Sequence, residues 1–106
     1  MKTAIISASA SGANQLVAAV AGKRIRVLHY RALVSGDVSI KFQSASTDIT
    51  GLMAFSANGG ISAGAPSIIP AGLIFEFQTE PGEALNINLS AAVAVGGYML
   101  YQEILV

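Results

Sequence analysis

The sequence predicts an all-β domain, and three observations lead to that prediction. Residues 85–89, LNINL, alternate strictly between apolar and polar side chains. Such alternation is typical of a strand with one buried face, because successive strand side chains point to opposite sides of the sheet. Residues 38–43, VSIKFQ, repeat the pattern. Turn residues recur about every eight to twelve positions, a spacing typical of a β-sandwich or barrel and not of βαβ units.

We expect eight strands, with bounds set by the turn residues between them. They cover residues 3–9, 15–20, 23–34, 38–43, 52–56, 73–79, 85–89 and 98–105. The glycine- and proline-rich residues 57–72 form the longest expected loop. The alanine-rich segment QLVAAVA at 15–21 has helical propensity. We nevertheless expect a strand there, because the segment is short for a helix and ends at Gly22. Residues 1–10 resemble a signal peptide only superficially, because their apolar core is too short, and we expect the first strand there.

The longest expected strand, residues 23–34, has an irregular pattern. Ile25 and Val27 share one face, whereas the apolar residues at 28, 30, 32 and 34 share the other. Either both faces of this strand are covered, or a β-bulge near Val27–Leu28 shifts the phase. Both alternatives indicate a central, bent strand.

Short antiparallel strands joined through one long crossover loop fit an eight-stranded antiparallel jelly-roll sandwich over residues 1–106, in which two Greek keys wrap into paired sheets. The alternative is an immunoglobulin-like β-sandwich. That alternative is less favoured because the chain has neither cysteine nor tryptophan, the marks of the true immunoglobulin core.

The composition points to association with other protein copies. Hydrophobic residues make up 53% of the chain. Charged residues make up only 11%, whereas roughly 25% of the residues in an average soluble protein are charged. Small neutral residues must therefore cover much of the exterior, and burial in an oligomer is the simplest way to protect such a surface from water. The net charge of zero speaks against nucleic acid or an anionic membrane as a partner.

The charged residues are unevenly distributed along the chain. All six Lys and Arg residues lie within the first 41 positions, whereas most of the acids lie in the second half. These charges either mix as the strands interleave, or they give the subunit one basic and one acidic flank that would meet neighbouring copies.

No residue pattern predicts catalysis, a cofactor or a metal site. The chain has no cysteine, and its single histidine, His29, has no acid near it in sequence, so an ordinary sheet-face position is expected. Glu76, Glu80 and Glu83 are expected to be solvated charges and not a glycosidase pair. Asp48 lies in a segment without the spacing of a calcium loop, so it is expected to bond its own loop.

Two weaker binding patterns remain. Residues 59–64, GGISAG, resemble a phosphate-binding loop only in glycine content. Tyr30, Tyr98 and Tyr101 are the aromatic side chains available to a carbohydrate site, because the phenylalanines of the expected strands are predicted to be buried.

The predicted subunit or partner interface combines basic and apolar residues. Arg24 and Arg26 share a face of the long strand, and Arg31 lies opposite unless the bulge realigns it. In the long loop, Ile68 and Ile69 lie between two prolines, where they either close the end of the sandwich or contact a neighbouring chain.

Three segments resemble the small virion proteins found in many tailed-phage genomes. These are SASGANQLVAAVAGKRIRVL near the start, TDITGLMAFSANGG in the middle and GEALNINLSAAVAVGGYMLYQE near the end. The resemblance implies a virion setting and no catalytic residues. We therefore expect a non-enzymatic jelly-roll structural protein of a phage particle, such as a capsid (head) decoration or fibre-base subunit.

The expected partners follow from that role. They are further copies of the chain, with a homotrimer favoured, and the major capsid protein or other virion proteins. The protein would be made in the host bacterial cytoplasm and end in the virion. The alternative is a carbohydrate- or receptor-binding jelly-roll module at a fibre tip.

Overall fold

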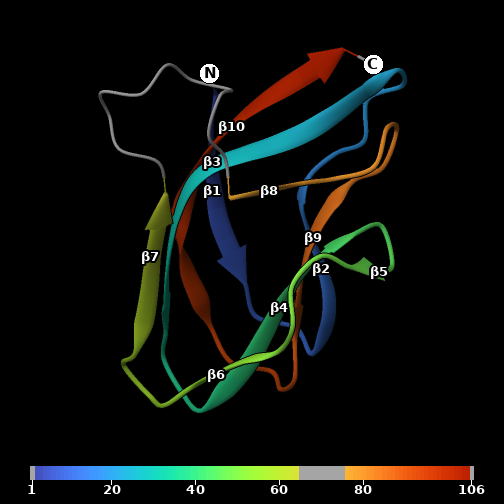
Figure 1. Ribbon diagram of the computed structural model, residues 1–106. Coiled ribbons are helices and arrows are strands. Elements are labelled where there is room, and N and C mark those ends of the chain that lie inside the picture. Colours follow the sequence, from blue (N-terminus) through green and yellow to red (C-terminus); the bar gives the residue numbers. More distant parts are fainter. Residues whose placement is uncertain (1, 65–75, 106) are drawn as a thin grey trace.

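The computed structural model describes residues 2–64 and 76–105, which form strands joined by turns and loops (Figure 1). Two antiparallel sheets pack as a sandwich, which confirms the all-β prediction. Within the described ranges no helix is long and apolar enough to cross a membrane.

The first sheet, sheet A, joins strands from both ends of the chain. Its members are β1 (Lys2–Ala8), β10 (Val95–Leu105), β3 (Lys23–Val34), β7 (Gly60–Gly64) and β8 (Phe77–Gln78). The order is β1-β10-β3-β7, and β8 also pairs with β3. In Figure 1 the blue β1, red β10 and cyan β3 lie together although they are distant in sequence.

The second sheet, sheet B, supplies the opposite layer of the sandwich. Its members are β2 (Gly12–Val17), β9 (Leu85–Leu89), β4 (Val38–Ser44), β5 (Thr47–Asp48) and β6 (Met53–Phe55). The order is β2-β9-β4-β5, and β6 also pairs with β4. Along the chain the strands cross from sheet A to sheet B between β1 and β2 and again between β3 and β4.

The alternating sequences place their apolar residues in the core as expected. In β9 the leucines and isoleucine are buried, and the asparagines between them are half-buried on the outer face. Edge-to-face and tilted aromatic contacts fill the space between the sheets, with ring centroids 5.0 Å apart for Tyr30 and Phe42 and 4.9 Å apart for Phe42 and Phe77. Such pairs add to the stabilisation that burial alone provides.

The irregular pattern of β3 is explained by a β-bulge at the expected place. His29 pairs with Leu100, but the next pair of the β3–β10 ladder joins Val27 to Tyr101, so Leu28 is the extra residue. Both Val27 and Leu28 are buried, and the inward-facing set changes from odd to even positions across the bulge. Figure 1 shows β3 and β10 curving together.

Two strands begin three residues before the expected position. β2 begins at Gly12 and ends at Val17, earlier than the expected 15–20, because the N–H of Lys23 bonds the carbonyl of Val20 and forms a turn there. β10 begins at Val95, so Gly96 and Gly97, which precede the expected strand 98–105, lie inside it.

The segment that was expected to form the longest loop contains a strand. Residues 60–64 pair with β3 as β7, so the glycine-rich segment is a strand of sheet A and not a phosphate-binding loop. Of the strand expected at 73–79, Phe77–Gln78 forms β8, and residues 73–75 lie outside the described ranges. The two-residue β5 was not predicted. It pairs with β4, where Gln43 lies opposite Asp48.

Candidate interaction surface

The β-bulge in β3 determines which of its charged residues face outward together. Before the bulge, the half-buried Arg24 and Arg26 alternate with buried residues, and after it His29 and Arg31 do the same. Because the bulge adds one residue, these four side chains face the same side of sheet A. Arg31 therefore joins Arg24 and Arg26 on one face, as the bulge alternative predicted.

The strand register extends this outer face across sheet A. Arg31 pairs with Tyr98, and Tyr98 pairs with Ile5 of β1. Ile5 is 77% exposed, Leu33 is 53% exposed and Tyr98 is 39% exposed. We call these four residues, Ile5, Arg31, Leu33 and Tyr98, the sheet A patch. It combines apolar side chains with one exposed guanidinium.

The three predicted interface arginines do not form a free basic strip. Arg26 donates through Nε to Oε1 of Gln78 at 3.1 Å. A nitrogen of Arg24 lies 3.9 Å from a carboxylate oxygen of Glu80, and Arg24 Nε is buried without a hydrogen-bond partner in the described part of the chain. Arg31 is the most exposed of the three. The other two predicted interface residues, Ile68 and Ile69, lie outside the described residues.

Ion pairs join the two halves of the sequence. Lys2 pairs with Glu103, and Arg24 lies close to Glu80, so bases from the first half meet acids from the second. This agrees with mixing of the charges as the strands interleave.

His29 lies on the outer face beside Tyr98. The Tyr98 hydroxyl is 3.4 Å from His29 Nε2, and the ring centroids are 5.8 Å apart at an angle of 40°. Within residues 2–64 and 76–105, no group of three or more His, Cys, Asp or Glu side chains could hold a metal ion. His29 is thus described as a sheet-face histidine packed against the ring of Tyr98.

Of the three tyrosines considered for ligand binding, only Tyr98 belongs to the exposed surface. Tyr30 is 5% exposed inside the aromatic core, where burial and, to a lesser extent, Glu76 raise the pKa of its hydroxyl. Tyr101 is half-buried and packs against the core.

The outer face of sheet B is a network of polar side chains bonded to each other. Gln43 donates to Asp48 at 2.8 Å, and Asn88 donates to Gln43 at 3.3 Å. Lys41 Nζ lies 3.1 Å from Asp48. The Gln43 amide, followed by the Lys41 ammonium, lowers the pKa of Asp48. Asp48 thus bonds side chains of the neighbouring strand β4, whereas a bond to the backbone of its own loop was expected.

The glutamates do not form a pair of facing carboxylates. Glu83 accepts a hydrogen bond from the Ser44 hydroxyl at 2.5 Å. Glu80 lies beside Arg24, and Glu76 is exposed. Glu76 and Glu80 are exposed, as the sequence predicts, whereas Glu83 is half-buried and bonded to Ser44.

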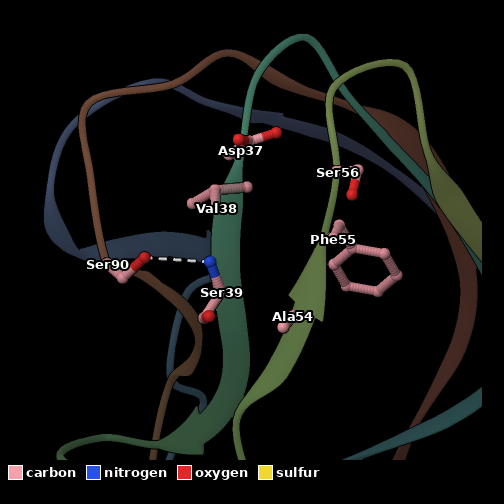
Figure 2. A pocket seen from close by; sticks show the side chains of 7 residues that line it. All are labelled: Asp37, Val38, Ser39, Ala54, Phe55, Ser56 and Ser90. Carbon is pink, nitrogen blue, oxygen red and sulfur yellow. Dashed lines mark hydrogen bonds between the residues drawn. The ribbon is translucent and has the colours of Figure 1, made fainter.

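An open hollow of about 410 Å³ lies where β4 and β6 meet the segment after β9 (Figure 2). Its polar lining comes from Asp37 and the hydroxyls of Ser39, Ser56 and Ser90, whereas the ring of Phe55 extends from β6 away from Ser39 and Ser90 and packs against the core. Asp37 Oδ1 accepts a bond of 2.8 Å from the N–H of Ala57, and Ser90 Oγ accepts one of 2.9 Å from the N–H of Ser39. No sequence pattern indicates these residues as a group, because they are far apart in the chain and follow no motif.

A second open hollow, of about 600 Å³, lies at the end of sheet A beside the sheet A patch. Ser7, Leu33, Gly96 and Gly97 are among its lining residues. It therefore continues the patch across the end of β10.

No family model, curated protein or solved structure matches this chain.

Proposed function

We propose that this protein is a non-enzymatic structural subunit of a phage particle, a capsid decoration or fibre-base protein that assembles with further copies of itself. The observation that carries the proposal is the sheet A patch. Three apolar side chains lie outward there on a chain with only 11% charged residues, and exposed apolar surface of this kind marks protein contacts. The resemblance of the sequence to small virion proteins supplies the setting.

The strand order supports a jelly roll as the fold of this subunit. Sheet A follows β1-β10-β3 with β7 and β8, and sheet B follows β2-β9-β4 with β5 and β6. Taking β5 with β6 and β7 with β8 as two interrupted strands gives the arrangement that two Greek keys produce in an eight-stranded jelly roll. In an immunoglobulin-like sandwich the first two strands would share a sheet, whereas β1 and β2 lie in different sheets here.

The virion setting can be tested by locating the chain. We expect quantitative mass spectrometry to find it in many copies in gradient-purified particles from infected cells that carry its gene. Particles that contain no copy of the chain would overturn the virion role.

The role of the sheet A patch can be tested with a matched pair of variants. The double variant Leu33→Ser and Tyr98→Ser removes apolar surface from the patch, whereas Leu52→Ser removes a side chain that is 64% exposed outside it. We expect the double variant alone to be lost from purified particles and from self-assembled oligomers. Equal incorporation of both variants would contradict this use of the patch. Sedimentation gives the number of copies, and three is the number that the sequence analysis favours.

The second candidate function, binding of a carbohydrate or receptor at a fibre tip, is favoured by the hollow of Figure 2. One carboxylate and three serine hydroxyls there could accept and donate hydrogen bonds to sugar hydroxyls. On a glycan array, Asp37→Ala should lose any signal that the wild-type chain gives. An array without hits would remove this candidate.

A further inference from the structure

Strand β1 is an edge of sheet A. Among the described residues its only strand partner is β10, with seven consecutive pairs from Lys2–Tyr101 to Ala8–Val95 and no register shift. In an antiparallel ladder, alternate residues direct both their N–H and C=O groups away from the partner strand. β1 therefore carries a row of main-chain donors and acceptors that a further strand could pair with.

Among the described residues, this edge has few of the features by which proteins usually prevent strand addition. Those features are prolines, charges, bulges and very short edge strands. β1 has no proline, and its single charged residue, Lys2, is paired with Glu103 of β10. By contrast, the edge strand β2 of sheet B has a register shift between Gln15 and Val17, and its Asn14 side chain bonds the carbonyls of Ala10 and Gly12.

The sequence of β1 is complementary to itself in the antiparallel direction. Ile5 is the middle of the seven residues Lys2–Ala8, so two copies that overlap over the whole strand place Ile5 opposite Ile5 of the second copy. The same register places Thr3 opposite Ser7 on the outer face and Ala4 opposite Ile6 on the inner face. Lys2 then meets Ala8, so no like charges oppose each other.

The Ile5–Ile5, Thr3–Ser7 and Ala4–Ile6 pairs are compatible with strand pairing, and the Lys2–Ala8 pair at each end introduces no repulsion. Directly opposed residues in an antiparallel pair lie on the same face, and aliphatic pairs and hydroxyl pairs both stabilise such contacts. A small residue opposite a large one, as for Ala4 and Ile6, fits side by side. Pairing would also cover Ile5, which is 77% exposed, and would extend the apolar row from Tyr98 across both copies.

We infer that β1 pairs with β1 of a second copy about a two-fold axis at Ile5, so that the two A sheets become one. About three or four of the seven aligned pairs would each exchange two main-chain hydrogen bonds. This inference rests on the self-association proposed above, but not on the virion setting. A two-fold contact closes on itself, so an assembly of three copies would need a different surface.

The contact is small, because it uses one strand from each copy. Interfaces well below the standard size of roughly 1,600 Å² form weak or transient complexes. We therefore expect a reversible equilibrium between monomer and dimer with a dissociation constant of about 1 to 100 µM. In a particle, many neighbouring copies would raise the effective concentration above that range.

The test uses residue 5, because in this register it meets its own copy. Ile5→Lys and Ile5→Glu each place like charges opposite each other, and sedimentation should show a rise of at least about tenfold in the dissociation constant. An equal mixture of the two variants places Lys opposite Glu and should restore a heterodimer. Leu105→Lys is the control, because Leu105 is also 77% exposed but lies beyond the β1–β10 ladder and should leave the dimer intact.

The outcomes separate this inference from the proposed self-association. A wild-type chain that remains monomeric up to about 1 mM would overturn both. A wild-type oligomer that both Ile5 variants leave unchanged would overturn only the β1 pairing, and so would a mixture that stays monomeric. Thermal unfolding of each single variant should match the wild-type monomer, which shows that a lost dimer is not a lost fold.

Discussion

Replacement of Gly97 by alanine tests how closely β10 approaches β3. Gly97 has a φ of +154°, a conformation that L side chains rarely adopt. A Cβ atom added there would lie 1.8 Å from the carbonyl oxygen of Arg31 and 2.8 Å from its carbonyl carbon. These are backbone atoms in the middle of a paired strand, so no side chain can move to make room.

The expected cost has two parts. An unfavourable backbone conformation costs about 1 to 3 kcal/mol. To relieve the overlap β10 must move away from β3, which weakens about two ladder hydrogen bonds at roughly 1 kcal/mol each. The total of about 3 to 5 kcal/mol is a large part of the 5 to 15 kcal/mol that stabilises a typical domain. For a domain of this size it lowers the Tm by roughly 15 to 30 °C.

The adjacent glycine provides the control. Gly96 has no atom within 4 Å of an added Cβ, so we expect Gly96→Ala to change the stability little. Thermal and urea unfolding of the two variants, followed by circular dichroism, gives the comparison. A Gly97→Ala variant that unfolds within a few degrees of Gly96→Ala would refute the close approach of the two strands.

Three further predictions concern the core, a buried hydrogen bond and the polar face of sheet B. Phe42 is 0% exposed between Tyr30 and Phe77, so Phe42→Ala should lower the free energy of unfolding by about 3 to 5 kcal/mol in urea titrations, whereas Leu52→Ala should change it by less than about 0.5 kcal/mol. Thr79 Oγ1 accepts a hydrogen bond of 2.9 Å from the N–H of Ile25. Thr79→Val leaves that buried N–H unpaired and should lower the free energy of unfolding by about 1 to 3 kcal/mol, whereas Thr79→Ser keeps a hydroxyl and should retain more of the stability. Equal losses in the two variants would contradict this role of the hydroxyl. The pKa of Asp48 is lowered from 3.8 by Gln43 and Lys41, so its carboxylate stabilises the fold above that value and the contribution is lost as the pH falls through the lower folded-state pKa. Asp48→Asn should therefore be less stable than wild type at neutral pH and approach it near about pH 2, and a difference independent of pH would contradict the assignment.

Local patterning predicted much of the sandwich because burial and strand geometry act over a few residues. The alternation in β9 and β4 identified their inner faces, and the change of phase at Val27–Leu28 located the bulge. The bulge then accounts for Arg31 lying on the same face as Arg24 and Arg26.

The misplaced elements involve glycines whose role depends on distant strands. Gly96 and Gly97 were expected to precede β10, but they lie within it. Gly97 lies directly against the backbone of Arg31, which is far away in sequence. Gly60–Gly64 was expected to be loop, but β3 supplies the pairing that makes it a strand. A single sequence does not reveal these partners, since a glycine pattern alone fits both turns and close approaches between strands.

One exposed member of the sheet A patch, Ile5, can be recognised in the sequence. Ile5 and Ile6 are adjacent in a strand, so one of them must face away from the core. Ile6 is 1% exposed and Ile5 is 77% exposed. The hollow of Figure 2 left no such signal, because Asp37, Ser56 and Ser90 converge only through the packing of three separate segments.

The two outer faces of the sandwich differ in how much free energy would be gained by burying them against another protein. On sheet B the amides of Gln43 and Asn88 already bond neighbouring groups, so covering that face would remove water from polar groups without forming many new bonds. On sheet A, Ile5 and Leu33 lie exposed, and removing them from water is favourable by itself. We therefore expect copies to meet through sheet A and its β1 edge, with the hydrogen-bonded face of sheet B left toward solvent. The low charge of the chain fits this expectation, because amide side chains form much of the bonded network on sheet B and exposed apolar side chains lie on sheet A.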